Sequence, residues 1–186
     1  DGAIVDSMMF DGLTCTIEHC VMGEATERYA QELNLSREAQ DTFSAQSHER
    51  AAKAQKDGLF VDEITPVSIP SRNGDDFVIA EDEGIRPDID VASLGRLAPA
   101  FEANGSITAG NASQISDGAA AVIVTTLDHA DSLGVEPLAE IVSHGQVAGP
   151  DTSLLLQPSN AIKKSLQNTD LNLSDLEIFE INEAFA

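Results

Sequence analysis

Residues 118–126 constrain the fold most, because they form an uninterrupted run of small and β-branched residues, G-A-A-A-V-I-V-T-T. Such a run is typical of a strand buried on both faces of a sheet. Two further segments, 138–143 and 176–181, have strand character, and helices are expected at 127–133 and 158–166. The order strand, helix, strand, helix, strand predicts a parallel α/β sheet.

The part of the chain before this run, from about residue 10 to 110, is predicted to be mostly helical and rich in loops. Ser36 is predicted to cap a helix that Asp57 and Gly58 end at about residue 56. Asn73 and Gly74 lie between two apolar stretches and predict a hairpin turn. The expected elements are helices at 22–33, 36–56 and 91–97 and extended chain at 59–69 and 76–80.

Charge and cysteine content exclude several classes of function. The 32 acids against 10 bases give a net charge of −22, which argues against nucleic acid or an anionic membrane as a partner. An ordinary solvated surface and a high-salt organism both account for this acidity. Cys15 and Cys20 are too few for a disulfide framework and poorly spaced for zinc. We therefore expect free, half-buried thiols, no metal site and a cytoplasmic location.

Residues 106–121 form a loop of small polar residues that leads into the apolar run. Within it, Gly110 and Gly118 bracket small polar residues, and glycine lets a backbone approach a ligand closely. From the residues alone, a ligand-binding loop and a tight turn are equal interpretations. The closing residues 182–186, N-E-A-F-A, follow a predicted strand at the position where ligands collect in open α/β sheets.

These segments, in this order, resemble the thiolases, the family of acetyl-CoA acetyltransferases and 3-ketoacyl-CoA thiolases. The resemblance covers nearly the whole chain. The matching motifs are D-G-L at 11–13, M-G at 22–23, L-S-R-E-A-Q-D at 35–41, Q-K-D-G-L-F at 55–60, P-A-F at 99–101, T-A-G-N-A-S at 108–113, D-G-A-A at 117–120 and N-E-A-F-A at 182–186.

The resemblance implies a partial thiolase-like α/β fold, layered αβαβα. Residues 1–126 would be the end of the N-terminal domain, including a CoA-binding loop domain at about 10–110. Residues 127–186 would start the C-terminal domain. The N-terminus has no initiating Met and no signal peptide. The missing Met fits a fragment or a processed start. The resemblance implies an internal fragment of the family, because the family motifs with the nucleophilic Cys, the activating His and the second Cys would lie outside these residues.

The implied activity is acyl transfer between CoA thioesters, by thiolysis of 3-ketoacyl-CoA or by condensation of two acetyl-CoA. Thiolases use a nucleophilic Cys, an activating His and a second Cys as acid and base. Neither Cys15 nor Cys20 matches these motifs, so the fragment alone should be inactive. Coenzyme A would be a substrate, no other cofactor is expected, and the family implies a homodimer or tetramer. The alternatives are a thiolase-fold synthase or lipid-transfer-type thiolase and, in another class, a non-catalytic CoA-binding or interaction module.

The resemblance also implies roles for single residues. Asn182 matches the family Asn that holds a water in an oxyanion hole, a task that suits an uncharged amide. Arg86 would contact the nucleotide end of CoA and Ser113 the pantetheine amide. Val21 and Ala98 stand where the family commonly has a His and a basic residue, which affects substrate preference. The expected CoA- and substrate-binding residues are Leu13, Met22, Arg86, Ser93, Phe101, Ala109, Ser113, Ala184 and Phe185.

Overall fold

The structure is a computed structural model that describes residues 2, 4–72, 74–152 and 154–186. The chain divides into two compact units. The first unit contains Asp1–Tyr29 and Ile115–Asn182, and the second contains Ala30–Gln114 and Glu183–Ala186. Most of the predicted binding residues therefore belong to the second unit, together with the last four residues of the chain.

The long helix α2 (Arg37–Lys56) is the scaffold of the second unit. The Ser36 hydroxyl accepts a hydrogen bond from the Ala39 amide at 3.1 Å, which confirms the predicted N-cap. Asp57 caps the other end, and Gly58 follows with a φ of 67°, a left-handed conformation that glycine adopts readily. Both predicted ends of this helix are confirmed.

A short hairpin follows α2. β1 (Val67–Ile69) pairs antiparallel with β2 (Phe77–Ile79), so the predicted hairpin is confirmed, with shorter strands than expected. Residues 59–63 form turns and not extended chain, because the Glu63 amide donates to the Phe60 carbonyl at 2.9 Å. Asn73 of the predicted turn lies outside the described residues.

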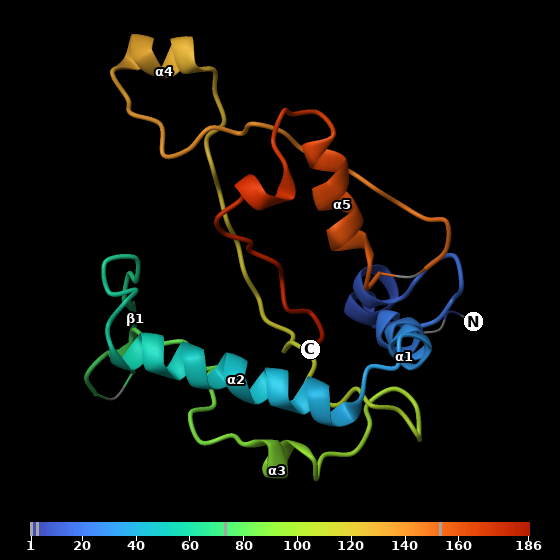
Figure 1. Ribbon diagram of the computed structural model, residues 1–186. Helices are drawn as coiled ribbons and strands as arrows, with labels where there is room; N and C mark the ends of the chain where they lie inside the picture. Colours follow the sequence, from blue (N-terminus) through green and yellow to red (C-terminus); the bar gives the residue numbers. More distant parts are fainter. Residues whose placement is uncertain (1, 3, 73, 153) are drawn as a thin grey trace. The chain divides into compact units, whose positions relative to one another are not determined.

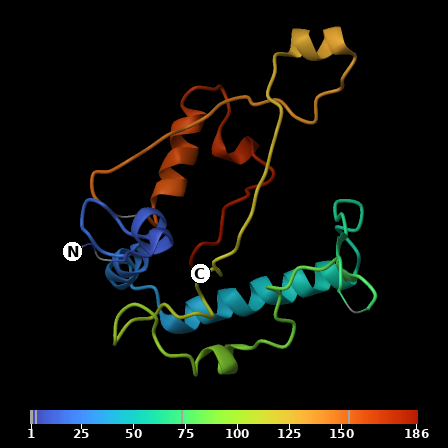
Figure 2. The ribbon, with the colours of Figure 1, turned by 180° about the vertical axis from the view of Figure 1, so that it is seen from behind.

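Helix α3 (Val91–Leu94) packs against α2, and the views from opposite sides agree on this arrangement (Figures 1 and 2). It starts at a capping box formed by Asp90 and Ser93. The helix ends before residue 97, the predicted end, with Gly95 at its C-cap. Its last residue, Leu94, has no exposed surface and forms part of the small core of this unit.

The first unit contains the π-helical turn η1 (Met8–Leu13), α4 (Leu127–Leu133), α5 (Gln157–Leu166) and the 3-10 turn η2 (Leu173–Asp175), and α1 (Met22–Glu32) begins in it. Helices were expected at 22–33, 127–133 and 158–166, and all are confirmed within a residue. The Thr126 hydroxyl caps α4, and Gly134 ends it with a φ of 65°.

The strands predicted at 118–126, 138–143 and 176–181 are not formed: the strands that the described part of the chain contains are β1 and β2. The apolar side chains of these three segments are exposed to solvent, with Ile123 95% exposed and Ile178 86% exposed. A strand needs a neighbour to pair its backbone groups and a packed layer to cover its side chains. The described residues supply neither to these three segments, so the sequence pattern alone does not produce the sheet.

Candidate functional site

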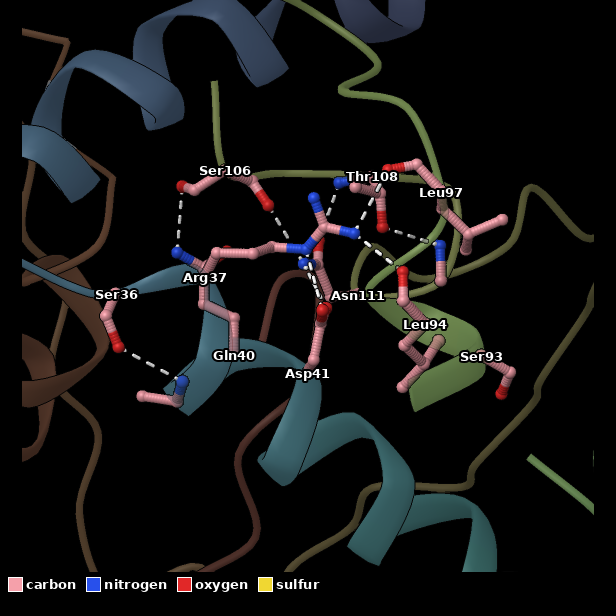
Figure 3. A network of polar contacts seen from close by, with 12 residues as sticks. Ser36, Arg37, Gln40, Asp41, Ser93, Leu94, Leu97, Ser106, Thr108 and Asn111 are labelled. Atoms are coloured by element: carbon pink, nitrogen blue, oxygen red, sulfur yellow. Dashed lines mark hydrogen bonds and ion pairs between the residues drawn. The ribbon is translucent and has the colours of Figure 1, made fainter. Parts of the chain in front are cut away.

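A buried polar network joins α2 to the loop that contains residues 106–111 (Figure 3). Asn111 is 3% exposed, and its side-chain nitrogen donates to Asp41 Oδ1 and to the Ser106 carbonyl, both at 3.0 Å. The Asn111 oxygen accepts from the Thr108 amide at 2.7 Å. A single amide side chain therefore fixes the loop on itself and on the helix.

Arg37 extends this network to the segment that follows α3 (Figure 3). Its Nε lies 2.7 Å from Asp41 Oδ2, and its Nη2 donates to the carbonyls of Leu94 and Leu97 at 2.6 and 3.1 Å. The Asp41 side chain is only 2% exposed, and it is tolerated there because both Arg37 and Asn111 donate to it. Three segments of the second unit are thus held together by charge-assisted hydrogen bonds.

Gly110 packs closely against apolar side chains of the same unit. A Cβ at this position would lie 2.4 Å from Leu94 Cδ2 and 2.6 Å from Leu97 Cδ1. The sequence suggested that glycine here lets the backbone approach a ligand. The close approach that the structure contains is to two leucines, so protein packing by itself accounts for this glycine.

The last four residues of the chain lie against the same loop. The Ser113 amide donates to the Ala184 carbonyl at 2.9 Å, and the Ala186 amide donates to the Asn111 carbonyl at 2.9 Å. These bonds flank an antiparallel bridge between Ala112 and Phe185. The closing segment Glu183–Ala186 is therefore paired with the loop like a short strand.

Side chains reinforce this pairing from two other parts of the unit. The Phe185 ring meets the Phe101 ring edge to face, with centroids 6.3 Å apart and planes at 74°. The Ser47 hydroxyl on α2 donates to Glu183 Oε2 at 2.6 Å. Of the predicted site residues, the structure thus brings together Phe101, Ser113, Ala184 and Phe185.

The remaining predicted residues of the second unit are separate from this cluster or have structural partners. Arg86 is exposed, and its backbone amide donates to His48 Nδ1 at 3.2 Å. The Ser93 hydroxyl donates to the Asp90 carbonyl at 2.8 Å inside the capping box. Hydrogen bonds from Ser93 hold the pKa of the Asp90 carboxyl below its usual value. Ala109 is exposed.

Three predicted residues belong to the first unit. Leu13 is half-buried at the end of η1, Met22 is 36% exposed at the start of α1, and Asn182 is exposed. An open groove of about 710 Å³ lies elsewhere, on the second unit. It is lined by Ala52, Lys53, Gln55, Lys56, Asp57, Glu81 and Pro87. No predicted site residue lines this groove, although Pro87 follows Arg86 directly.

Both cysteines are free and half-buried, as expected. A polar cluster in the first unit surrounds Cys20. Glu18 accepts hydrogen bonds from Thr152 Oγ1 at 2.5 Å and from Arg28 Nη2 at 2.8 Å, and the same Arg28 nitrogen lies 3.1 Å from Cys20 Sγ. The Thr152 hydroxyl and then Arg28 lower the pKa of the Glu18 carboxyl, against an opposing effect of desolvation. Among the described residues, no group of three or more His, Cys, Asp or Glu side chains is placed to hold a metal ion.

The lowered pKa of Glu18 predicts a pH-dependent stability of the first unit. Because the folded pKa lies below the ordinary value of 4.5, the ionised carboxylate stabilises the fold above that value. This contribution should disappear as the pH falls through the folded pKa. Urea unfolding monitored by circular dichroism on the acid side of neutrality should show a weaker pH dependence in Glu18→Gln than in the wild type. Asp128→Asn controls for the loss of one negative charge, and equal pH profiles for all three proteins would contradict the prediction.

Comparison with known families identifies the chain. The model of the thiolase N-terminal domain matches residues 1–128, and that of the thiolase C-terminal domain matches residues 135–186. The chain belongs to the thiolase family. The family predicted from the ordered motifs is therefore confirmed.

Individual thiolases match the chain over its whole length. It is 51% identical over 186 residues to a "Probable acetyl-CoA acetyltransferase" of Mycolicibacterium smegmatis, covering 100% of this chain and 48% of that protein. It is 45% identical to a "Probable acetyl-CoA acyltransferase" of Staphylococcus aureus strain COL, covering 99% and 47%. The crystal structure of the Bacillus anthracis acetyl-CoA acetyltransferase superposes with a TM-score of 0.88 at 38% identity, covering 100% and 47%. The chain thus has a partial thiolase fold, as predicted, and spans about half the length of these relatives.

Sequence reasoning missed the residues that hold the loop at 106–111 and the closing segment together. In the sequence, Arg37, Asp41 and Asn111 stand out only as parts of motifs, and nothing singles out Ser47. The spacing of Arg37 and Asp41 is a signal for an ion pair, because residues i and i+4 are neighbours on a helix. Nothing in the sequence pairs either residue with Asn111.

In the part of the chain that the structure describes, no helix combines the length and the apolar character needed to cross a membrane.

Proposed function

We propose that this chain is part of an acyltransferase of the thiolase type that transfers acyl groups between CoA thioesters. The reaction would be thiolysis of 3-ketoacyl-CoA or condensation of two acetyl-CoA. The observation that carries the proposal is 51% identity over all 186 residues to a protein named as an acetyl-CoA acetyltransferase. Because the chain spans 48% of that relative, we assign the nucleophilic Cys, the activating His and the second Cys to sequence outside these residues.

Within this proposal the present chain supplies one catalytic group, Asn182. Its neutral amide would hold a water that stabilises the oxyanion of the acyl-transfer step, because an amide donates hydrogen bonds without a charge to desolvate. The further Cys of the complete enzyme would form the acyl-enzyme. Cys15 and Cys20 take no part in this chemistry.

The proposed cradle for CoA is made by the residues inferred from the family motifs. Arg86 would contact the nucleotide, Ser113 the pantetheine amide, and Ala184 with Phe185 the acyl end. The hydrogen bond between Ser113 and Ala184 and the ring contact between Phe185 and Phe101 support a common role for these four residues. The remaining proposed contacts are Leu13, Met22, Ser93, Phe101 and Ala109, of which Ser93 also serves the capping box of α3.

The proposal also covers the domain boundaries, the cofactor, the compartment and the oligomeric state. Residues 1–126 would end the N-terminal domain, with the CoA-binding loop domain at about 10–110, and residues 127–186 would start the C-terminal domain. The separate family matches at 1–128 and 135–186 support this division. Coenzyme A would be a substrate with no other cofactor. We further propose a cytoplasmic homodimer or tetramer, and the two free cysteines are in keeping with a reducing compartment.

The proposal predicts a difference between this chain and the complete thiolase expressed from the same gene. The purified 186-residue chain should give no thiolysis of acetoacetyl-CoA, whereas the complete protein should cleave it. Loss of the 3-ketoacyl-CoA absorbance measures both reactions, and calorimetric titration with CoA controls for a folded binding site. Turnover by the chain alone would contradict the assignment of the nucleophile. Binding of CoA by the complete protein without turnover would favour the non-catalytic module.

A further inference from the structure

We propose that Ser47 is a positioning residue for catalysis, which acts through Glu183 on the closing segment Glu183–Ala186 and on its neighbour Asn182. The inference rests on the proposed function and assigns a role to a helix residue that no motif singled out. Ser47 is half-buried on α2, and its hydroxyl donates to Glu183 Oε2 at 2.6 Å. A hydrogen bond to a carboxylate is shorter and stronger than one between neutral groups.

Beside the ring contact of Phe185 with Phe101, Ser47 provides one of three hydrogen-bond anchors that the described residues give to this segment of four residues. The other two are backbone hydrogen bonds, from the Ser113 amide to Ala184 and from Ala186 to the Asn111 carbonyl. Each anchor holds a different residue, and the bond from Ser47 holds Glu183, the residue directly after Asn182. Neither of the two backbone bonds is made by Glu183 itself.

Two of these contacts lead back to side chains of α2. Asn111 is held by Asp41 of α2 at 3.0 Å, and Ser47 lies six residues further along the same helix. Residues six positions apart on a helix are separated by about 9 Å along its axis. The closing segment is thus tied to one rigid helix at two points, once through the loop at Asn111 and once through Glu183. Such support restrains Glu183, the residue covalently joined to Asn182, and catalytic groups must be held to within about 0.5 Å.

The bond with Ser47 also defines the role of Glu183. Glu183 is exposed, and the carboxylate of an exposed Glu can act as a base. In the structure one oxygen is engaged by a hydroxyl of α2. Glu183 is therefore assigned as the link between the helix and the closing segment, with Ser47 as its donor.

The test uses the complete thiolase and compares Ser47→Ala, Ser47→Thr and Glu183→Ala. Loss of one solvent-accessible hydrogen bond should lower kcat for thiolysis about five- to tenfold and change the KM for CoA less, because the backbone hydrogen bond between Ser113 and Ala184 remains while the position of the Asn182 amide is less well fixed. Ser47→Thr keeps a hydroxyl and should restore most of the rate. Gln46→Ala, the exposed neighbour on α2, is the matched control and should behave as wild type.

The double variant Ser47→Ala/Glu183→Ala should be no slower than Glu183→Ala alone, because both changes remove the same bond. A wild-type kcat in Ser47→Ala, or fully additive losses in the double variant, would overturn the proposal. Amide hydrogen exchange provides a second readout, and Ser47→Ala should speed exchange at Ala186 and Ser113. If the parent protein has no thiolase activity, the proposed function fails, and the exchange rates alone decide whether Ser47 anchors the segment.

Discussion

Replacement of Asn182 by Ala should lower the turnover of the complete thiolase by about 100-fold while leaving its affinity for CoA nearly unchanged. Removal of one donor from an oxyanion hole typically costs this much, because the donor acts on charge that develops only in the transition state. The pantetheine and nucleotide contacts proposed for Ser113 and Arg86 are untouched by the substitution. Steady-state thiolysis gives kcat, and calorimetric titration gives the dissociation constant of CoA.

Two further variants sharpen this test. Asn182→Asp preserves the shape but places a carboxylate where negative charge develops, so it should be at least as slow as Asn182→Ala. Asn168→Ala, at an exposed asparagine after α5, should retain the wild-type rate. A wild-type turnover in Asn182→Ala would contradict the catalytic role and leave Asn182 as a structural residue.

The helices could be predicted because the residues that cap their ends lie next to them in the sequence. The Ser36 hydroxyl, the Thr126 hydroxyl and Gly134 each act within a few positions of the backbone groups that they cap. The strands at 118–126 and 176–181 could not be obtained in the same way. Their apolar pattern requires pairing partners and covering layers from elsewhere in a sheet, and the described residues do not provide them.

The candidate site was predictable only in part, for a related reason. The N-E-A-F-A motif pointed to Ala184 and Phe185, but their contacts with Ser113 and Phe101 depend on tertiary structure. Ser93 shows a different limit, because Asp90 is a preferred N-cap residue by sequence, but the return bond from Ser93 that completes the capping box is seen only in the structure. The charged side chain of Asp41 is normally expected at the surface, yet here it is 2% exposed.

The buried network predicts that Asn111→Ala should lower the free energy of unfolding of the second unit by about 3 kcal/mol. The substitution removes hydrogen bonds to Asp41, Ser106 and Thr108 and leaves a buried carboxylate with one donor fewer. Urea unfolding followed by far-UV circular dichroism, to which α2 contributes strongly, measures the change. Asn104→Ala, at an exposed asparagine in the preceding loop, is the matched control and should differ little from wild type.

Asn111→Asp separates the loss of a donor from a general loss of packing, because it keeps the size of the side chain. It places a second carboxylate next to Asp41, at the position where the Asn111 side-chain nitrogen lies 3.0 Å from Asp41 Oδ1, so repulsion should raise the pKa of the introduced carboxyl. A raised folded pKa means that the folded state binds the proton more tightly, and stability should recover as the pH falls. Acid should therefore partly rescue Asn111→Asp and leave Asn111→Ala without such a gain. If both variants show the same pH profile and a loss no larger than that of Asn104→Ala, Asn111 does not hold the loop.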